Sequence, residues 1–145
     1  MKQEYKELLL KDLCCRLPYG VKVDVSYSKG CASSLRSKIC SEGVSNMDTL
    51  IFWLFQEGEV YLKPYLFPFS SMTEEQKEEL DKITYGSVSI DKNFFYDLCN
   101  CSKIDTYCII DIIDWLNRNH IDYRGLIPMG LAIDSANLNV YNKEE

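Results

Sequence analysis

The sequence predicts a single compact α+β domain, in which an N-terminal helix and a long C-terminal helix pack on a small, mainly antiparallel sheet. Helical and strand-like patterns follow one another without regular βαβ alternation, and no linker divides the chain. A length of 145 residues with 46% hydrophobic side chains suits one domain. We therefore expect residues 1–141 to form the domain and residues 142–145 to form a frayed acidic tail.

The chain begins with an amphipathic helix followed by a strand. Over Glu4–Leu17, side chains at steps of three and four residues share one face, which is typical of a helix: Tyr5, Leu8, Leu9, Asp12, Leu13, Arg16 and Leu17. Pro18 and Gly20 end this helix. Over Val21–Tyr27, apolar and polar residues alternate, which predicts a half-buried strand.

Three further extended segments are expected in the middle of the chain. Ser28–Gly30 is a candidate hairpin turn, with Leu35–Cys40 as a weaker partner strand. Leu50–Gln56 is rich in Ile, Phe and Trp and predicts a central, buried strand. The two prolines in Val60–Phe69 cannot donate hydrogen bonds to a sheet, so we expect an edge strand or an extended crossing segment there.

Two more helices are expected in the second half. Thr73 and Gln76 fit a capping box, which predicts a surface helix that runs to about Ile83. Tyr85–Asp97 fits either a short strand or a helical turn. Lys103–Asn119 is the longest predicted helix, with an inward stripe of Ile104, Cys108, Ile112, Trp115 and Leu116 and an outward face of Asp111, Asp114 and Arg118.

The chain is expected to end with a turn over Asp122–Pro128 and a last strand over Gly130–Ile133.

Composition argues against three classes of protein. Sixteen basic and 22 acidic residues give a net charge of −6, which disfavours nucleic-acid binding. The apolar runs Leu50–Phe55 and Ile109–Ile113 are far shorter than the roughly 20 residues of a membrane-spanning helix. Seven cysteines, an odd number, after a start that has no signal-peptide pattern favour free thiols in a host cytoplasm over a secreted disulfide scaffold.

The residues that carry chemistry form no recognisable catalytic or metal motif. The cysteines lack the spacing of a zinc site, so we expect no metal and no cofactor. His120 is the one histidine, and it either joins Cys101 or Cys108 and Asp122 in a nucleophilic set or caps the end of the long helix. The carboxylates of Asp111, Asp114, Asp122 and Asp134 could form a magnesium or glycosidase set, but Asp111 and Asp114 are spaced like the solvated carboxylates of many helices, so we expect no active site there.

Aromatic residues gather in the middle of the chain and offer either a core or a binding surface: Phe52, Trp53, Phe55, Tyr61, Tyr65, Phe67 and Phe69. Of these we expect Tyr65 and Phe67 to contact a ligand or partner. A second candidate site is a pocket around His120, Asp122, Tyr123 and Arg124, which would suit a small-ligand binder or an enzyme.

Three blocks of sequence carry a family resemblance. The blocks are residues 10–21 (LKDLCCRLPYGV), residues 63–75 (KPYLFPFSSMTEE), and residues 114–132 around DWLN, HIDYRGLI and GLA. In these blocks the chain resembles a family of small uncharacterised proteins encoded by phages, prophages and other mobile elements of gut Bacteroidetes. No activity is known for that family, so the resemblance implies no catalytic residue. The family has a basic residue between the two prolines of the middle block where this chain has Phe67, which argues against an anionic ligand there.

Together these observations favour a non-catalytic phage or mobile-element accessory protein that binds a host or phage protein in the cytoplasm. The alternative is the small-ligand binder or enzyme described above. The sequence leaves open whether the chain forms homo-oligomers.

Overall fold

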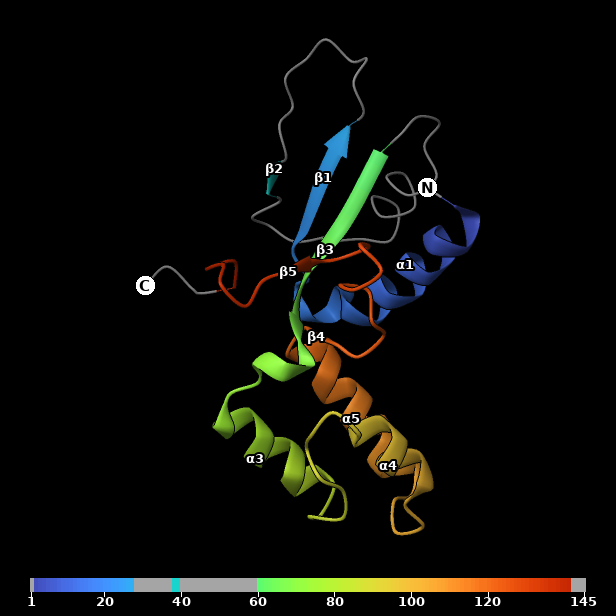
Figure 1. Ribbon diagram of the computed structural model, residues 1–145. Coiled ribbons are helices and arrows are strands. Elements are labelled where there is room, and N and C mark those ends of the chain that lie inside the picture. Colours follow the sequence, from blue (N-terminus) through green and yellow to red (C-terminus); the bar gives the residue numbers. More distant parts are fainter. Residues whose placement is uncertain (1, 28–37, 40–59, 142–145) are drawn as a thin grey trace.

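An antiparallel ladder between β1 (Val23–Tyr27) and β3 (Val60–Pro68) forms the centre of the sheet (Figure 1). The structure is a computed structural model and describes residues 2–27, 38–39 and 60–141. Apolar and polar residues alternate along β1, as its sequence predicts, and its Val23 is buried in one cluster with Leu9 and Leu13 of α1.

Three two-residue strands complete the five-stranded sheet of the described residues. β2 (Lys38–Ile39) pairs antiparallel with β1, which agrees with the expected hairpin partner. β4 (Ile121–Asp122) and β5 (Ile133–Asp134) each pair parallel with β3. The α+β class is therefore confirmed. The longest ladder, β1–β3, is antiparallel, as is the short β1–β2 pairing, and the two short parallel pairings make the sheet mixed.

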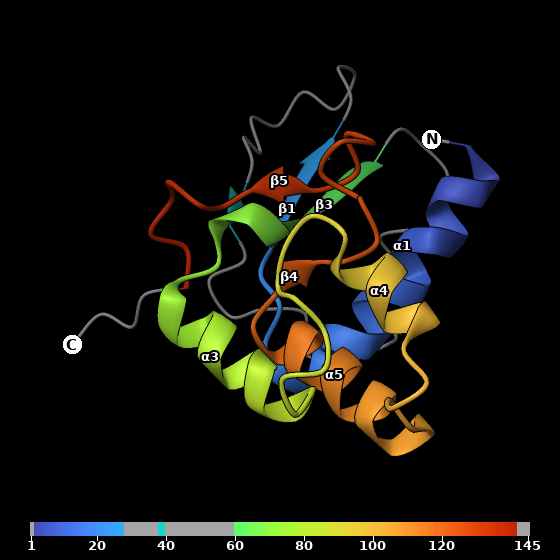
Figure 2. The same ribbon diagram turned by 60° about the horizontal axis from the view of Figure 1, so that its bottom comes forward.

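The N-terminal helix lies beside the sheet, and the helices of residues 74–118 lie below the sheet in the view of Figure 1 (Figures 1 and 2). The helical elements of the described residues are α1 (Gln3–Arg16), η1 (Leu17–Tyr19), η2 (Phe69–Ser71), α3 (Glu74–Ile83), α4 (Phe94–Asn100) and α5 (Thr106–Arg118). The predicted capping box is present, because Thr73 and Gln76 exchange hydrogen bonds at the start of α3. Gly20 ends the N-terminal helical segment in the left-handed region, at φ 68°.

The two prolines do not break the strand that contains them, so the prediction of an edge or crossing segment is wrong. β3 is the central strand. Tyr65 donates its N–H to the Lys22 carbonyl at 3.0 Å, and Phe67 donates to the His120 carbonyl at 2.9 Å. Pro64 and Pro68 lie next to these two donors in the sequence, so neither hydrogen bond requires an N–H from a proline.

The long helix begins three residues later than predicted. Asp105 is its N-cap and accepts a 2.8 Å hydrogen bond from the Cys108 backbone N–H.

The segment Tyr85–Asp97, for which the sequence left a strand and a helical turn open, enters a helix at its end, where α4 begins. Val88 in its first half is buried, but it lies in a loop and not in a strand. The last strand also lies further along the chain than predicted: β5 begins at Ile133, which is the last residue of the expected Gly130–Ile133 strand.

Two apolar clusters hold the domain together. The first lies between α1, the sheet and residues 126–132, and contains Leu9, Leu13, Val21, Val23, Leu62, Leu66, Leu126, Leu131 and Ala132. The second lies between α3, α4, α5 and β4, and contains Met72, Leu80, Val88, Phe94, Leu98, Cys108, Ile112, Trp115, Leu116 and Ile121. Because β4 follows α5 directly and pairs with β3, it joins the helical half to the sheet.

Several predictions fall on residues outside the described ranges. These are the Ser28–Gly30 turn, most of Leu35–Cys40, the Leu50–Gln56 strand with Phe52, Trp53 and Phe55, and the 142–145 tail.

Candidate functional site

The α5 helix carries apolar side chains on both of its faces. Its inward face is buried as the sequence predicts, with Cys108, Ile112, Trp115 and Leu116 in the second core cluster. Four further apolar residues of α5 are exposed, and we call them the outer face of α5: Tyr107 (79% exposed), Ile109 (37%), Ile110 (57%) and Ile113 (39%). Tyr107, Ile110 and Ile113 follow one another at steps of three residues, and Ile109 lies four residues before Ile113, so they share one side of the helix.

Polar side chains of α5 occupy a narrow strip beside this face. Asp111, Asp114 and Arg118 lie there, as the sequence predicts, and Arg118 forms an exposed ion pair with Asp114 at 2.8 Å. The Tyr19 hydroxyl also donates to Asp114, which fixes the end of η1 against α5. A surface helix normally has one apolar stripe, whereas a helix that is apolar nearly all round is typically covered on both sides. The outer face therefore has the character of a contact surface.

A hollow of about 340 Å³ lies where the end of α3 meets the start of α5, and it is continuous with the outer face through Tyr107. We call it the α3–α5 hollow. Its lining residues are Lys82, Ile83, Tyr85, Asp105, Tyr107, Cys108 and Asp111. Tyr85 is 84% exposed and lies in the left-handed region at φ 53°, which is unusual for a residue other than glycine.

The thiol of Cys108 lies against the backbone of α3 and donates to the Ile83 carbonyl at 3.0 Å. Burial, with the nearby carboxylates of Asp105 and Asp111, raises the pKa of this thiol above its ordinary value. A raised pKa favours the protonated thiol at neutral pH, and the thiol is a weaker nucleophile than the thiolate.

A second hollow, of about 470 Å³, lies between η2, α3 and the segment before α4. It is lined by Phe69, Ser70, Met72, Lys77, Ile90, Asp91, Lys92 and Phe95. Its charged groups are largely engaged: Lys77 pairs with Glu74 at 2.6 Å, and Asp91 accepts a 2.7 Å hydrogen bond from the Asn93 N–H.

The predicted residues Tyr123 and Arg124 join a buried charge cluster. Asp12 and Arg16, both fully buried on α1, form two hydrogen bonds of 2.8 and 3.1 Å. The Arg124 guanidinium lies 3.3 Å from the same carboxylate. The Tyr123 ring contacts both guanidinium groups, with the Cζ atoms of Arg16 and Arg124 at 5.3 and 5.0 Å from its centre.

Arg16 also connects this cluster to the sheet, because it donates to the Ile121 carbonyl of β4 at 2.9 Å. These contacts hold α1, β4 and the segment after β4 together. These contacts indicate a structural role for Tyr123 and Arg124, which is to fix the packing of α1 against the sheet.

Asp122 has its carboxylate fully engaged by the backbone. One oxygen accepts from the Leu126 N–H at 2.9 Å and the other from the Ile127 N–H at 2.8 Å. This arrangement builds the predicted turn after β4 and commits both carboxylate oxygens to the backbone.

His120 lies beside the sheet, stacked on Tyr141 with ring centres 4.1 Å apart. Burial, then the positive charges of Arg16 and Lys22, lower the pKa of His120 to about 4, although a backbone hydrogen bond with Tyr19 acts in the opposite direction. The imidazole is therefore neutral at pH 7. At neutral pH the ring thus carries no positive charge toward the negative end of α5, and the left-handed backbone of His120 (φ 54°) ends the helical turn.

Tyr65 and Phe67 lie on β3 and contact the same C-terminal tyrosine. The Tyr141 hydroxyl donates to the Tyr65 carbonyl at 2.7 Å, and the Phe67 and Tyr141 rings lie 5.7 Å apart. The Tyr65 side chain is buried. Of the six predicted site residues, the structure thus groups Tyr65, Phe67 and His120 around Tyr141 and groups Tyr123 and Arg124 around Arg16, and none of them lines either hollow.

Sequence reasoning missed the outer face and Tyr85. The sequence of α5 does indicate the outer face, because Ile109, Ile110 and Ile113 are apolar but lie outside the predicted inward stripe. For Tyr85, an exposed tyrosine in a turn, no such signal exists.

Three general findings limit the chemistry of the described residues. No three His, Cys, Asp or Glu side chains among them lie close enough to hold a metal ion. Their cysteines are free thiols: Cys14, Cys15, Cys99, Cys101 and Cys108. None of their helices combines the length and hydropathy that a membrane crossing needs.

In comparisons with known proteins, no family model, no curated protein and no solved structure matches this chain.

Proposed function

We propose that this chain is a non-catalytic phage or mobile-element accessory protein, which acts in the host cytoplasm by binding another protein through the outer face of α5. The observation that carries the proposal is the exposure of four large apolar side chains on a helix whose other face is already buried. Apolar area exposed in this way gains free energy when a partner covers it, at about 25 cal/mol per Å². The phage or mobile-element origin rests on the sequence resemblance of the three blocks.

The charges beside this face favour a partner other than a second copy of the chain. Asp111 and Asp114 flank it, and Arg118 is already paired with Asp114. Two copies meeting through this face would place like charges close together in a molecule of net charge −6. A partner with an apolar patch and a basic margin complements it instead.

The contacts of the alternative site favour a structural role. Asp122 is engaged by two backbone amides, His120 is buried and stacked, and Arg124 is paired with Asp12. An enzyme or small-ligand site needs such groups directed at a shared cavity. For this reason binding is proposed and catalysis is not.

A photo-crosslinking amino acid placed at position 110 tests the proposal in lysate of a gut Bacteroidetes host. We expect one protein to be captured from position 110 and not from position 129, because Met129 has similar exposure (44%) but lies outside the face. Capture at both positions alike, or capture only of a second copy of the chain, would contradict the proposal.

A further inference from the structure

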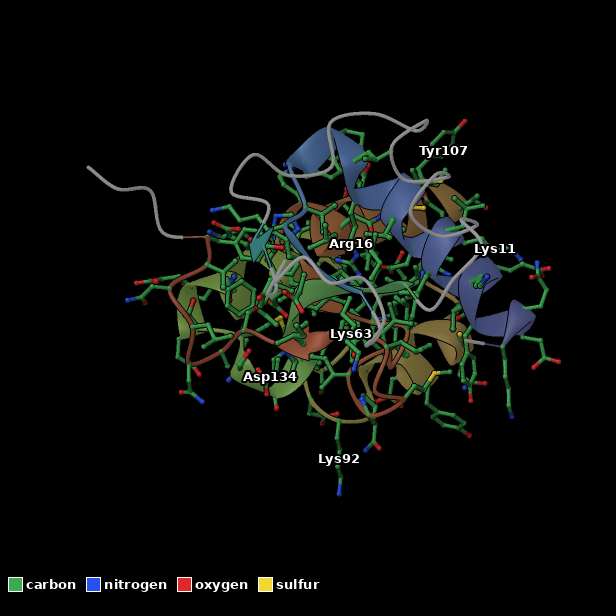
Figure 3. All side chains as sticks on the ribbon, turned by 90° about the horizontal axis from the view of Figure 1, so that it is seen from above. Lys11, Arg16, Lys63, Lys92, Tyr107 and Asp134 are labelled. Carbon is green, nitrogen blue, oxygen red and sulfur yellow. The ribbon has the colours of Figure 1, made fainter. Side chains whose placement is uncertain are left out.

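The two most exposed aromatic residues of the described chain, Tyr85 and Tyr107, both line the α3–α5 hollow. Tyr85 comes from the turn after α3 and Tyr107 from the first turn of α5. Figure 3 shows Tyr107 directed away from the body of the molecule, whereas Arg16 lies inside it. Exposed tyrosines are common at binding hot spots, because they offer a large apolar surface that loses little side-chain entropy on binding.

Hydrogen bonds fix the positions of the two segments that carry these rings, the turn after α3 and the first turn of α5. Besides the bond from the Cys108 thiol to Ile83, the Trp115 indole N–H donates to the Glu79 carboxylate at 3.1 Å, which ties α5 to α3. The Tyr85 turn is closed by hydrogen bonds from Tyr85 to the Lys82 carbonyl (3.3 Å) and from Gly86 to the Asp81 carbonyl (3.0 Å). The hollow is therefore formed before any ligand arrives.

The charge in the hollow is negative. It contains the carboxylates of Asp105 and Asp111 and the ammonium group of Lys82. Asp105 uses one oxygen to cap α5, and among the described residues Asp111 has no hydrogen-bond or ion-pair partner. Because Asp105 occupies the N-terminus of α5, the positive end of that helix is not available to an anion.

These features match a cationic side chain with an apolar stem. A guanidinium or ammonium group is attracted to the faces of aromatic rings and pairs with a carboxylate. Its methylene groups find apolar contacts on Ile83 and Cys108. A volume of about 340 Å³ is ample for one such side chain.

We propose that the α3–α5 hollow receives a lysine or arginine side chain of the partner protein, in contact with the rings of Tyr85 and Tyr107 and paired with Asp111. This assignment rests on the proposed function, because the hollow adjoins the outer face of α5 and would contact the same partner protein. The apolar face would provide contact area, and the hollow would select a basic partner.

A titration followed by NMR tests the assignment without a known partner. The probes are N-acetyl-arginine methylamide and N-acetyl-lysine methylamide, compared with the norleucine and glutamate derivatives. We expect saturable shifts of the Tyr85 and Tyr107 ring signals with the two cationic probes only, and weaker binding as salt is added. Equal binding of the norleucine derivative, preference for the glutamate derivative, or no binding of either cation would overturn the assignment.

Two variants locate the binding. Asp111→Asn should weaken binding of the arginine probe at least fivefold, whereas Asp134→Asn, which removes the same charge far from Tyr107, should leave it unchanged (Figure 3). Tyr85→Gly should also weaken it, and glycine suits the left-handed backbone at that position, so the fold is retained. Equal affinity in all three variants would place the probe elsewhere and overturn the assignment.

The outcome is separate from that of the proposed function. If the cationic probes fail while substitutions on the outer face abolish partner binding, the hollow is wrongly assigned and the proposed function stands. If the probes bind in the hollow while substitutions on the outer face leave partner binding intact, the proposed function fails and the hollow stands.

Discussion

The hydroxyl of Tyr141 replaces a missing backbone hydrogen bond between Lys22 and Tyr65. Tyr65 donates its N–H to the Lys22 carbonyl at 3.0 Å, but the reciprocal bond is not made directly. Instead, the Lys22 N–H donates to the Tyr141 hydroxyl at 3.2 Å, and that hydroxyl donates to the Tyr65 carbonyl at 2.7 Å. A side chain from the C-terminal segment thus bridges the point where the β1–β3 ladder ends.

Tyr141→Phe should lower the free energy of unfolding by about 1–3 kcal/mol, because it leaves a backbone donor and acceptor without a partner. Urea unfolding measures this effect, and Tyr96→Phe is the matched control because Tyr96 is 73% exposed. Equal stability of the two variants would show that the bridge does not hold the ladder.

His120 should make the protein less stable in mild acid. Its pKa is about 4 in the folded chain, below the ordinary value of 6.5, so the unfolded chain binds the proton first as the pH falls. Its contribution to stability is complete above pH 6.5 and is lost between pH 6.5 and about 4, a change of about 3 kcal/mol.

The variant His120→Asn isolates this effect, because asparagine tolerates the left-handed backbone but does not titrate. Unfolding measured from pH 7.5 to 4 should show a steeper loss of stability in the parent chain than in the variant. Parallel curves would mean that His120 titrates normally.

Two Asp–Arg pairs with the same four-residue spacing should differ strongly in their effect on stability. The Asp12–Arg16 side chains are 0% exposed, whereas those of Asp114 and Arg118 are 42% and 61% exposed. Arg16→Met leaves a buried carboxylate with only the Arg124 contact and should cost about 3–5 kcal/mol. Arg118→Met should cost less than about 1 kcal/mol. Thermal or urea unfolding of the two variants compares them directly, and similar losses would contradict the burial of the first pair.

Local patterns predicted the parts of the fold that depend on neighbouring residues. The helical spacing placed Asp12 and Arg16 on the inner face of α1, where they are buried, and the capping box at Thr73 is present. The partners of Arg16 at Ile121 and of Asp12 at Arg124 lie more than a hundred residues away in sequence, so no local pattern reveals them.

The β3 strand and the candidate site show why the remainder could not be predicted. The rule that proline excludes a central strand is misleading here, because it concerns the hydrogen bonds that the proline itself would donate, and Tyr65 and Phe67 donate the bonds to the neighbouring segments instead. The predicted site residues were chosen for their chemistry, yet tertiary contacts engage them: Asp122 with backbone amides and His120 with Tyr141.

Substitutions on the outer face of α5 should separate binding from stability. In the double variant Ile110→Gln, Ile113→Gln, both residues are exposed and glutamine is a good helix former, so the free energy of unfolding should change by less than about 0.5 kcal/mol per site. Urea unfolding checks this, and a large loss of stability would show that the face packs within the chain.

The most direct test of the central claim is the dissociation constant between the purified chain and the partner captured from position 110, measured by calorimetry. The double variant Ile110→Gln, Ile113→Gln should bind about 10- to 100-fold more weakly than the parent chain, as expected for removing an apolar hot spot. Met129→Gln, the exposed control outside the face, should bind like the parent. Unchanged affinity of the double variant, or equal loss in the control, would contradict the account.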